Sequence, residues 1–580
     1  MSATRCFGCL ALRRLPACGT PRQQRGVPVP VRLPLRLGMG RRWSSSSVTW
    51  EPPEGHETGI NIYNSVTKTK VPLRTNHPGL LTWYNCGPTV YDSAHIGHAL
   101  CYVKIDIIRR ILTRVFDMNV ISVMGITDID DKIIRRSQEL KVNFREITEK
   151  YEQEFFSDMD RLRVWRPSLA PRVTEHVPHI IAFTQGIMDR GLAYVADDGS
   201  VYFNTGAYGR YGKLFPVETM AAAAVGPAVV RASVKRSIRD FVLWKSAKKG
   251  EPSWPSPWGQ GRPGWHIECS AMASHILGVP LDLHAGGKDL IFPHHENEEA
   301  QCCAYHDTRQ WCNYWLHTGH LHTRGTEKMS KSLYNTISVD ALLEQNSVNA
   351  FRLYCLLSHY RNNVEFSPTS MDIAKAHMRR IRSFLHDAYA YINGQLKCAP
   401  LDEPALKMKL VETSAKVKRL LADDFDTARA VDAVMELITF GNKELKKQPQ
   451  GTSLSRSAGS MAAICSYIHY LMEDVFGIHL PSVTDASNLS LESGGRLFHV
   501  MNSVVELRDK VRRYALLQDT PPQGQPALSA EEVKAKKRER TPLLQACDDL
   551  RNDLLKSGLQ IKDHQGNSSW SLADDPTEKK

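Results

Sequence analysis

Two short segments, far apart in the chain, carry side chains suited to bind phosphate. His95-Ile96-Gly97-His98 places two imidazoles three residues apart, on one face if a helix begins there. Lys328-Met329-Ser330-Lys331-Ser332 places two ammonium groups around a serine. Such groups can hold phosphate oxygens and stabilise the charge that develops when a phosphorus atom is attacked. Each segment alone is more typical of ordinary surface residues, so the interpretation depends on both being present.

A nucleotide bound here would be held without a phosphate loop of the GxxxxGK[ST] type, because the sequence contains none. Gly286-Gly287-Lys288-Asp289 is a candidate third element. Two glycines let backbone approach a ligand closely, and an aspartate just beyond them could hold a ribose hydroxyl. On its own, this pattern is more often a turn.

A further group of residues has the chemistry of metal ligands. It consists of Cys86, Cys269, His294 and Glu298. His294 and Glu298 are four residues apart, which places them on one helical face. Two thiolates, an imidazole and a carboxylate are a set that suits zinc. The spacing leaves alternatives open, because His295 or Cys302 could replace a member, and the thiols could be buried groups with no metal.

These side chains fall at the ends of predicted secondary structure. Leu81–Cys86 is predicted to be a buried strand, followed by the turn Gly87-Pro88. Apolar residues from Ile96 to Ile111 follow helical spacing, and Val120–Ile126 is a second predicted strand. A strand, a helix and a strand in this order predict a parallel sheet. Such sheets bind ligands beyond the carboxyl ends of their strands, where helix N-termini attract phosphate.

The rest of the chain divides by composition. A stretch at about 170–260 looks like an insertion, with an alanine-rich piece at 221–224 and a Pro/Trp-rich piece at 252–258 that predicts a rigid loop. Beyond about 345, helical periodicity dominates, for example in Asp423–Ile438 and Met461–Val475. We therefore predict these domains: a leader, 1–47; a catalytic domain, 48–345; a helical region, 346–420; a helical domain, 421–517; a linker, 518–530; and a small C-terminal segment, 531–580.

Most of the chain's excess positive charge lies at its start. The first 50 residues contain nine arginines, no lysine and no acid, so the net charge of +12 falls to +3 for the remainder. An arginine-rich, acid-free start that ends in four serines is typical of a transit peptide and predicts import into the mitochondrial matrix. The alternative is a basic arm that binds RNA. We expect no membrane insertion, because no apolar run is long enough to span a bilayer.

Four blocks of sequence carry a resemblance to a known family. They are Cys86–Asp92, Gly125–Lys132, Gly264–Met272 and Phe292–Glu298. Together with the His95–His98 and Lys328–Ser332 segments, they resemble the motifs of the cysteinyl-tRNA synthetases, which are class I aminoacyl-tRNA synthetases. The likeness runs from about residue 58 to 380 and continues more loosely beyond.

The resemblance implies an α/β fold. Its parts would be a Rossmann-like catalytic domain with a parallel sheet, an inserted connective subdomain, and an α-helical region that binds tRNA. Within that region, residues 346–420 would contact the tRNA stem and residues 421–517 would form the anticodon-binding domain. It also implies ATP-dependent ligation of L-cysteine to mitochondrial tRNA(Cys) through a cysteinyl-adenylate, with Mg²⁺ accompanying ATP. Basic residues at Arg379, Arg380, Arg382 and 534–540 are candidates for RNA contact. No obligate protein partner is evident from the sequence.

Site residues follow from the same resemblance. It implies one zinc ion per chain, bound by Cys86, Cys269, His294 and Glu298. It implies an amino-acid pocket lined by Gly87, Thr127 and Trp265. The ATP-binding and catalytic groups would be His95, His98, Gly286, Gly287, Asp289, Lys328 and Lys331.

A second activity is also described for this family, the synthesis of cysteine persulfide with pyridoxal phosphate. Lys132, Lys328 and Lys331 would match the lysines that hold this cofactor. The pattern departs at Arg135, which replaces a lysine and cannot form a Schiff base.

Two other functions remain as alternatives. A small-molecule cysteine ligase, as in mycothiol synthesis, would share the catalytic blocks but would not need the long helical tail. A non-catalytic, zinc-bearing RNA-binding module would have no use for intact histidine and lysine motifs together.

Overall fold

The computed structural model describes residues 50–216, 234–322, 336–396, 398–447, 458–480, 493–516, 529–563 and 568–572. Several predictions concern residues outside these ranges. They are the arginine-rich start, the alanine-rich piece at 221–224, the Lys328–Ser332 segment and most of the predicted linker at 518–530. In the part of the chain that is described, no helix combines the length and the apolar character needed to cross a membrane.

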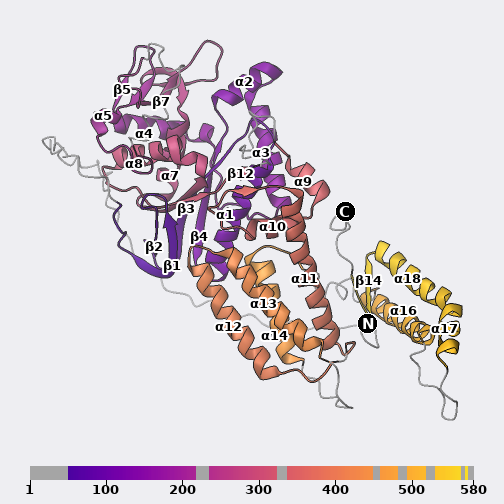
Figure 1. Ribbon diagram of the computed structural model, residues 1–580. Helices are drawn as coiled ribbons and strands as arrows, with labels where there is room; N and C mark the ends of the chain where they lie inside the picture. The colour runs from indigo at the N-terminus through magenta and orange to yellow at the C-terminus, as the bar shows by residue number, and fades with distance from the viewer. Residues whose placement is uncertain are drawn as a thin grey trace, which may run out of the picture. The chain divides into compact units, whose positions relative to one another are not determined.

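A parallel sheet of four strands forms the centre of the catalytic region (Figure 1). Its order is β11-β10-β3-β4, and each neighbouring pair is parallel. The strands are β3 (Leu80–Thr89), β4 (Asn119–Thr127), β10 (Leu281–Gly287) and β11 (Cys312–Thr318). The two strands predicted from sequence are confirmed within β3 and β4, and Cys86 pairs with Gly125 in their register. The carboxyl ends of these strands therefore meet at one edge of the sheet. Open α/β sheets bind their ligands at this edge.

Helix α1 (Ile96–Arg114) connects β3 to β4, as its apolar spacing predicted. Most of its residues are buried, and it packs against α10 (Val348–Leu356) and the η5 turn (Tyr470–Val475). A buried ion pair fixes this packing: the Arg352 guanidinium donates to Asp106 Oδ2 at 2.5 Å, and both side chains are almost fully shielded. This ion pair thus joins α1 of the strand-helix-strand unit to α10 of the helical region.

The predicted insertion is confirmed as a separate sheet between β4 and the next central helix. The chain first forms α2 (Asp131–Leu140), α3 (Phe144–Arg161), η1 (Val173–Glu175) and α4 (Val177–Asp189). An antiparallel sheet of order β5-β6-β7-β9-β8 follows. Its strands are β5 (Ala193–Val195), β6 (Val201–Phe203), β7 (Phe241–Ser246), β8 (Trp254–Ser256) and β9 (Gly259–Pro263), with α5 (Thr205–Tyr208) after β6.

The prediction of a rigid loop at 252–258 is wrong in part. Residues Trp254–Ser256 form β8 and pair with β9. Because β8 is the edge strand, Pro255 can be accommodated without removing a ladder hydrogen bond.

Two further helices return the chain to the central sheet. They are α7 (Trp265–Leu277) before β10, and α8 (Glu296–His306) before β11. The short η2 (Lys288–Leu290) and η3 (Ile291–His295) turns lead from β10 into α8, and the Phe292-Pro293 peptide bond within η3 is cis. Helices α7 and α8 pack on each other, so residues near their first turns come close together. A hairpin of β1 (His56–Asn64) and β2 (Thr69–Thr75) precedes β3, and the short strands β12 (Leu321–His322) and β13 (Val364–Glu365) pair beyond β11.

The helical region forms a bundle in which α11, α12, α13 and α14 lie side by side (Figure 1). Its elements are α9 (Val339–Gln345), α10, α11 (Pro368–Ile392), α12 (Glu403–Ala422), α13 (Thr427–Leu445), α14 (Gly459–His469) and η5. The helix predicted from Asp423 begins only at Thr427. Asp424 and Phe425 have positive φ values of 63° and 54°, and Asp426 caps the helix by accepting from Arg429 N.

The last described elements form a small α/β unit. It contains α16 (Ser493–Ala515), α17 (Ala530–Glu539), α18 (Thr541–Lys556), β14 (Leu559–Asp563) and β15 (Ser568–Leu572). Helix α16 packs on α18 and β15, and Arg508 Nε donates to Cys547 O at 2.9 Å. The segment up to residue 517 thus packs with the segment beyond 530, although the prediction assigned them to different domains.

Candidate active site and metal centre

The first turn of α1 is closed by two histidines. His95 is the N-cap, and its Nδ1 accepts from Gly97 N at 3.1 Å and His98 N at 3.4 Å, while His98 Nδ1 accepts from His95 N at 3.4 Å. The two rings stack with centroids 3.8 Å apart. Because Nδ1 accepts in both rings, Nε2 is the ring nitrogen that carries the N–H group. The helix N-terminus therefore presents two oriented N–H donors, which suits an anion such as phosphate.

The Lys328–Ser332 segment lies outside the described residues, but the chain just after it contacts this helix start. Ile96 N donates to Ile337 O at 2.9 Å, and His95 forms a bridge with Ser338. Residues only a few positions beyond Ser332 are thus hydrogen-bonded to the His95–His98 turn.

The glycine pair sits at the end of β10, at the same edge of the sheet. A Cβ at Gly286 would come within 2.9 Å of the His295 ring, so this glycine makes room for a histidine rather than for a ligand. Gly287 begins the η2 turn. The half-exposed Asp289 carboxylate lies 3.2 Å from His320 Nε2. Asp289 therefore stands at the rim of the site, where a ribose hydroxyl could reach it.

Cys86, Cys269, His294 and Glu298 are brought together at the centre of this region. Their ligand atoms all lie within 4.8 Å of one another, and all four side chains are buried. The Sγ atoms of Cys86 and Cys269 are 3.9 Å apart, and Cys86 Sγ is 3.6 Å from Glu298 Oε1. His294 Nε2 is 3.1 Å from the same oxygen. The four donors come from β3, α7, η3 and α8, so only the tertiary fold assembles them.

This geometry fits a tetrahedral zinc ion. A Zn–S bond of about 2.3 Å and a Zn–O bond of about 2.1 Å place two thiolates about 3.8 Å apart and a thiolate and a carboxylate oxygen about 3.6 Å apart. The distances between the side chains agree with these separations. Burial raises the pKa values of the Cys86 thiol and the Glu298 carboxyl well above their ordinary values. A divalent cation reverses this effect, because it favours the deprotonated forms.

A second group of donors overlaps the first. Cys86, His284, His295 and Glu298 also lie within 4.8 Å of one another. The two groups share Cys86 and Glu298. The sequence already left His295 open as an alternative ligand. The group with two thiolates offers the softer donors, which zinc binds well.

Four further histidines surround these candidate metal ligands. His266 Nδ1 lies 2.9 Å from His294 Nδ1, and His284 Nε2 lies 3.0 Å from Glu298 Oε2. His295 Nε2 lies 3.3 Å from Cys86 Sγ, and its Nδ1 lies 2.8 Å from His317 Nε2. Burial lowers the pKa values of His266, His284 and His317 to about 3. These rings are therefore neutral at physiological pH and can each donate one hydrogen bond and accept another.

The residues expected to line the amino-acid pocket border the same centre. The ring of Trp265 stacks on His294 with centroids 4.4 Å apart and is partly exposed. Thr127 Oγ1 donates to Glu268 Oε2 at 3.2 Å. Gly87 follows Cys86 directly, and a Cβ there would collide with Gly125 O at 2.2 Å. Trp265 and Gly87 therefore lie directly beside two of the four donors, and Thr127 lies at the carboxyl end of β4.

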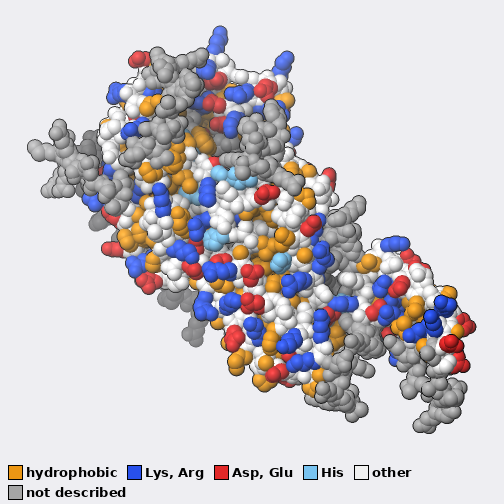
Figure 2. All heavy atoms as spheres, in the orientation of Figure 1, with side chains coloured by type: hydrophobic (Ala, Val, Ile, Leu, Met, Phe, Trp, Pro, Cys, Tyr) orange, Lys and Arg blue, Asp and Glu red, His pale blue; other side chains and the backbone are white. Residues whose placement is uncertain are grey.

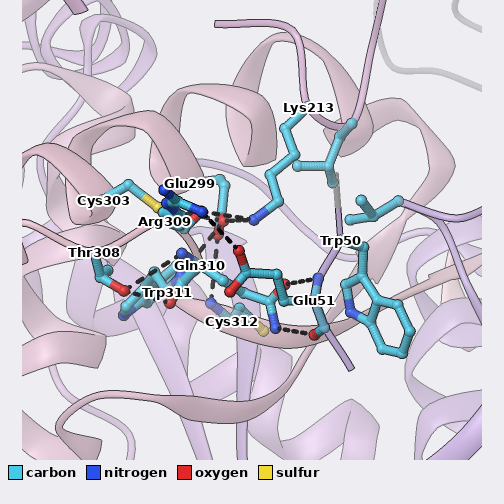
Figure 3. Close-up of polar contacts among 12 residues, drawn as sticks. Trp50, Glu51, Lys213, Glu299, Cys303, Thr308, Arg309, Gln310, Trp311 and Cys312 are labelled. Atoms are coloured by element: carbon cyan, nitrogen blue, oxygen red, sulfur yellow. Dashed lines mark hydrogen bonds and ion pairs between the residues drawn. The ribbon is translucent and has the colours of Figure 1, made fainter. Parts of the chain in front are cut away.

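Buried acids hold the first turn of α8 in place, and Figure 3 shows the polar contacts of one of them, Glu299. Glu299 accepts from Lys213 Nζ at 2.6 Å, with both side chains almost fully buried, and also from the backbone of Trp311 and Cys312. Glu296 accepts from four consecutive backbone amides, at residues 212–215. Glu298, one of the four candidate ligands, lies between Glu296 and Glu299 in sequence, in the turn that these contacts hold.

The sequence did not single out three histidines that surround these donors. They are His266, His284 and His317. His266 stands within the block Gly264–Met272, but no spacing relates it to His294. His284 and His317 lie on the neighbouring strands β10 and β11, and only their pairing brings them to the metal ligands.

Comparison with known proteins shows the family of this chain. The family described as tRNA synthetases class I (C) catalytic domain matches residues 72–376. A probable mitochondrial cysteine--tRNA ligase of Xenopus tropicalis is 46% identical over 551 residues, covering 94% of this chain and 95% of that protein. A cytoplasmic cysteine--tRNA ligase of Dictyostelium discoideum is 38% identical over 92% of this chain and 80% of that protein.

The fold is also found among solved structures. LeuRS of Agrobacterium radiobacter, in a ternary complex with tRNA and LeuAMS, aligns with a TM-score of 0.50 and 11% identity, over 70% of this chain and 85% of that one. The parallel sheet with its insertion and helical region is therefore a known architecture. With the matched family and the long, full-length similarity to its members, the chain belongs to the cysteine--tRNA ligases of the class I tRNA synthetases.

Proposed function

We propose that this chain ligates L-cysteine to mitochondrial tRNA(Cys) in two steps, through a cysteinyl-adenylate. The observation that carries the proposal is the meeting of four buried donors, two of them thiols, beside a helix start that presents two N–H donors. One half of this arrangement suits a sulfur-containing substrate and the other suits a nucleotide.

The metal ligands in this proposal are Cys86, Cys269, His294 and Glu298, with one zinc ion per chain. When bound, zinc favours the deprotonated thiol of a substrate and so separates cysteine from serine far better than ordinary contacts could. Four protein ligands usually indicate a closed, structural zinc. Glu298 is the ligand best placed to loosen, because its Oε2 atom already has a partner in His284.

In this proposal, residues at the carboxyl edge of the central sheet bind the nucleotide. The Nε2–H groups of His95 and His98 would bind phosphate oxygens, and Asp289 would bind the ribose. Gly286 and Gly287 shape the turn beneath them. Lys328 and Lys331 would stabilise the leaving pyrophosphate, with Mg²⁺ accompanying ATP. Catalysis would then consist largely of positioning and charge stabilisation.

Substrate cysteine would lie between these two halves. Its side chain would point to the thiol-rich centre, and its backbone atoms would lie along Gly87, Thr127 and Trp265. The Trp265 ring, stacked on His294, can close over a small substrate and exclude water from it. The terminal ribose of the tRNA would then attack the adenylate from the open side.

The proposed place of action is the mitochondrial matrix. The arginine-rich start supports this, as does the printed name of the Xenopus relative. A reducing compartment also agrees with the ten free cysteines among the described residues, most of which are buried. A persulfide-forming activity stays a prediction. Lys132 Nζ lies 5.5 Å from the centroid of the Tyr91 ring. The two lysines expected to act with it, Lys328 and Lys331, fall outside the described residues.

Replacing Cys86 with serine tests the proposal. Cys86→Ser exchanges a zinc-binding thiolate for a poor ligand, and we expect cysteine-dependent pyrophosphate exchange to fall by at least about 100-fold with loss of bound zinc. Cys465→Ser is the matched control, because Cys465 is also a buried free cysteine but lies in α14. Normal exchange by Cys86→Ser would contradict the zinc assignment.

Aminoacylation separates the alternatives. The wild-type enzyme should charge a mitochondrial tRNA preparation with cysteine and not with serine. A small-molecule ligase would show exchange without charging, and a binding module would show neither.

A further inference from the structure

Two segments that carry expected pocket residues are cross-linked at the edge of the central sheet. The first runs from Thr127, at the end of β4, to Asp131, at the start of α2. The second runs from Arg262, in β9, to Glu268, in α7. Thr127 donates to Glu268, and Asp131 forms an ion pair with Arg262. Thr127 and Trp265, which are expected to line the amino-acid pocket, therefore belong to segments that are joined twice.

The Asp131 carboxylate binds two cations of the inserted sheet. One of its oxygens pairs with the Arg262 guanidinium in β9, and the other pairs with Lys245 Nζ in β7. Arg262 and Lys245 are direct partners in the register of these two strands. Like charges in such a position repel each other and destabilise a sheet, so they favour an anion that contacts both. Asp131 supplies this anion from α2, which lies outside the inserted sheet.

Burial of Arg262 gives this contact more weight than an ordinary surface ion pair has. The side chain of Arg262 is only 7% exposed, although that of Asp131 is half-exposed. Exposed ion pairs contribute little, whereas a nearly buried cation is unfavourable without an anion. Among the described residues, the other acid near Arg262 is Glu251, whose Oε2 atom lies 3.9 Å from Nε. Glu251 belongs to the inserted segment itself, so Asp131 is the described acid that joins Arg262 to α2.

The ion pair also lies close to Trp265 along the chain. Only two residues separate Arg262 from Trp265, which is the first residue of α7. The second of them is Gly264, whose N atom donates to Leu243 O at 2.9 Å. A Cβ at Gly264 would lie only 2.3 Å from Val242 O, so the backbone here is packed closely against β7. The position of Arg262 therefore limits where α7 can begin and where the Trp265 ring can lie.

Thiolate binding alone cannot measure the length of a substrate. Homocysteine carries the same thiol as cysteine and one more methylene, so a centre that binds sulfur accepts both. A site separates such homologues by its walls, and one methylene changes the rate of reaction by about 10–200-fold. In the proposed site these walls include Thr127 and Trp265. The distance between their two segments is therefore a determinant of selectivity.

We propose that Asp131 is a positioning residue that sets the width of the amino-acid pocket. It holds the segment of Trp265 against the segment of Thr127, and so excludes thiol amino acids longer than cysteine. This inference rests on the proposed function and names a determinant of its selectivity. Without the carboxylate charge, Arg262 and Lys245 repel each other, and the inserted sheet is released from α2. The wider pocket then binds cysteine less tightly and rejects homocysteine less well.

The test removes the charge of Asp131 and keeps its size. In Asp131→Asn, we expect the KM for cysteine to rise several-fold in pyrophosphate exchange, while kcat and the KM for ATP stay unchanged. The ratio of kcat/KM for cysteine to that for homocysteine should fall about tenfold, because the extra methylene meets a looser wall. The zinc content should equal that of the wild type, which separates a change in the pocket from a general loss of structure.

Three further variants make the result decisive. Asp307→Asn is the matched control, because it makes the same exchange in an exposed ion pair, with Arg190 at 3.5 Å. Asp131→Glu keeps the charge and should retain most of the selectivity. The double variant Asp131→Asn/Arg262→Met should select no worse than Asp131→Asn alone, because both changes break the same ion pair.

The outcomes distinguish this inference from the proposal beneath it. An Asp131→Asn enzyme whose selectivity and KM for cysteine equal those of the wild type would overturn the role of Asp131 alone. Equal losses with cysteine and homocysteine, together with a raised KM for ATP, would also overturn it, because they indicate general damage. A wild-type enzyme without cysteine-dependent pyrophosphate exchange would overturn the proposed function, and the role of Asp131 with it.

Discussion

Helix α1 carries a lysine, Lys104, among its buried residues. On α1, Lys104 is only 2% exposed, and its Nζ atom has a single long contact, 3.4 Å to His359 O. Among the described residues it forms no ion pair with a carboxylate. Burial, the main cause, lowers the pKa of Lys104 from 10.5 to about 8. Lys104 therefore destabilises the folded protein when its amine is charged.

The pH dependence of stability follows from this shift. The folded state holds the Lys104 proton less tightly than the unfolded state does, so between pH 8 and pH 10.5 the unfolded chain binds more protons. The contribution of Lys104 to the free energy of unfolding therefore rises with pH in this window, and below it the charged amine costs about 3 kcal/mol. We expect Lys104→Met to be more stable than the wild type at pH 7, and this advantage should shrink by pH 10. Urea denaturation at both pH values checks this, and an advantage that is independent of pH would contradict it.

The site could be predicted from sequence where its residues are close along the chain. His294 and Glu298 follow from a four-residue spacing, and the His95–His98 turn from its position between a strand and a helix. His284 and His317 could not be found in this way, because each reaches the metal ligands only through the pairing of strands separated by a helix.

At the scale of elements, the central strands and α1 were predictable, because their apolar patterns are strong and local. The start of α13 was not, because Asp424 is occupied by tertiary contacts: its carboxylate accepts from Tyr63 N, Tyr360 and Arg361. Tertiary contacts also determine the position of α8. Its first turn is hydrogen-bonded to residues 212–215 of the inserted segment. The Lys213–Glu299 pair is the main ionic part of that connection.

We expect Lys213→Met to weaken the site through α8. Removing one partner of a buried ion pair leaves an uncompensated charge, which lowers the free energy of unfolding by about 3–5 kcal/mol. Since Glu298 lies beside Glu299, the affinity for zinc should fall as well. Lys556→Met provides the control, because its ion pair with Asp553 is largely exposed and worth little. Chemical denaturation and chelator competition measure both effects, and equal behaviour of the two variants would refute the role of α8 anchoring.

At the scale of the whole molecule, charge is spread rather than concentrated. Acidic and basic side chains are interspersed over the face seen in Figure 2, in keeping with a net charge of only +3 beyond the first 50 residues. Recognition of an RNA backbone then depends on small local groups of cations. Helix α17 offers one such group, with Lys534 and Lys537 exposed on it and the Arg540 guanidinium 3.7 Å from the ring centroid of Tyr514 just beyond.

The salt dependence of tRNA binding tests whether this group contacts phosphates. Each phosphate contact contributes about 0.7–0.9 to the slope of log affinity against log salt concentration. If Lys534 and Lys537 each make one, the double variant Lys534→Ala/Lys537→Ala should bind tRNA more weakly and show a slope smaller by about 1.4–1.8. Lys416→Ala is a suitable control, because Lys416 on α12 is already paired with Glu436. An unchanged slope in the double variant would mean that α17 is a solvated helix, and that the tRNA is held by other cations of the chain.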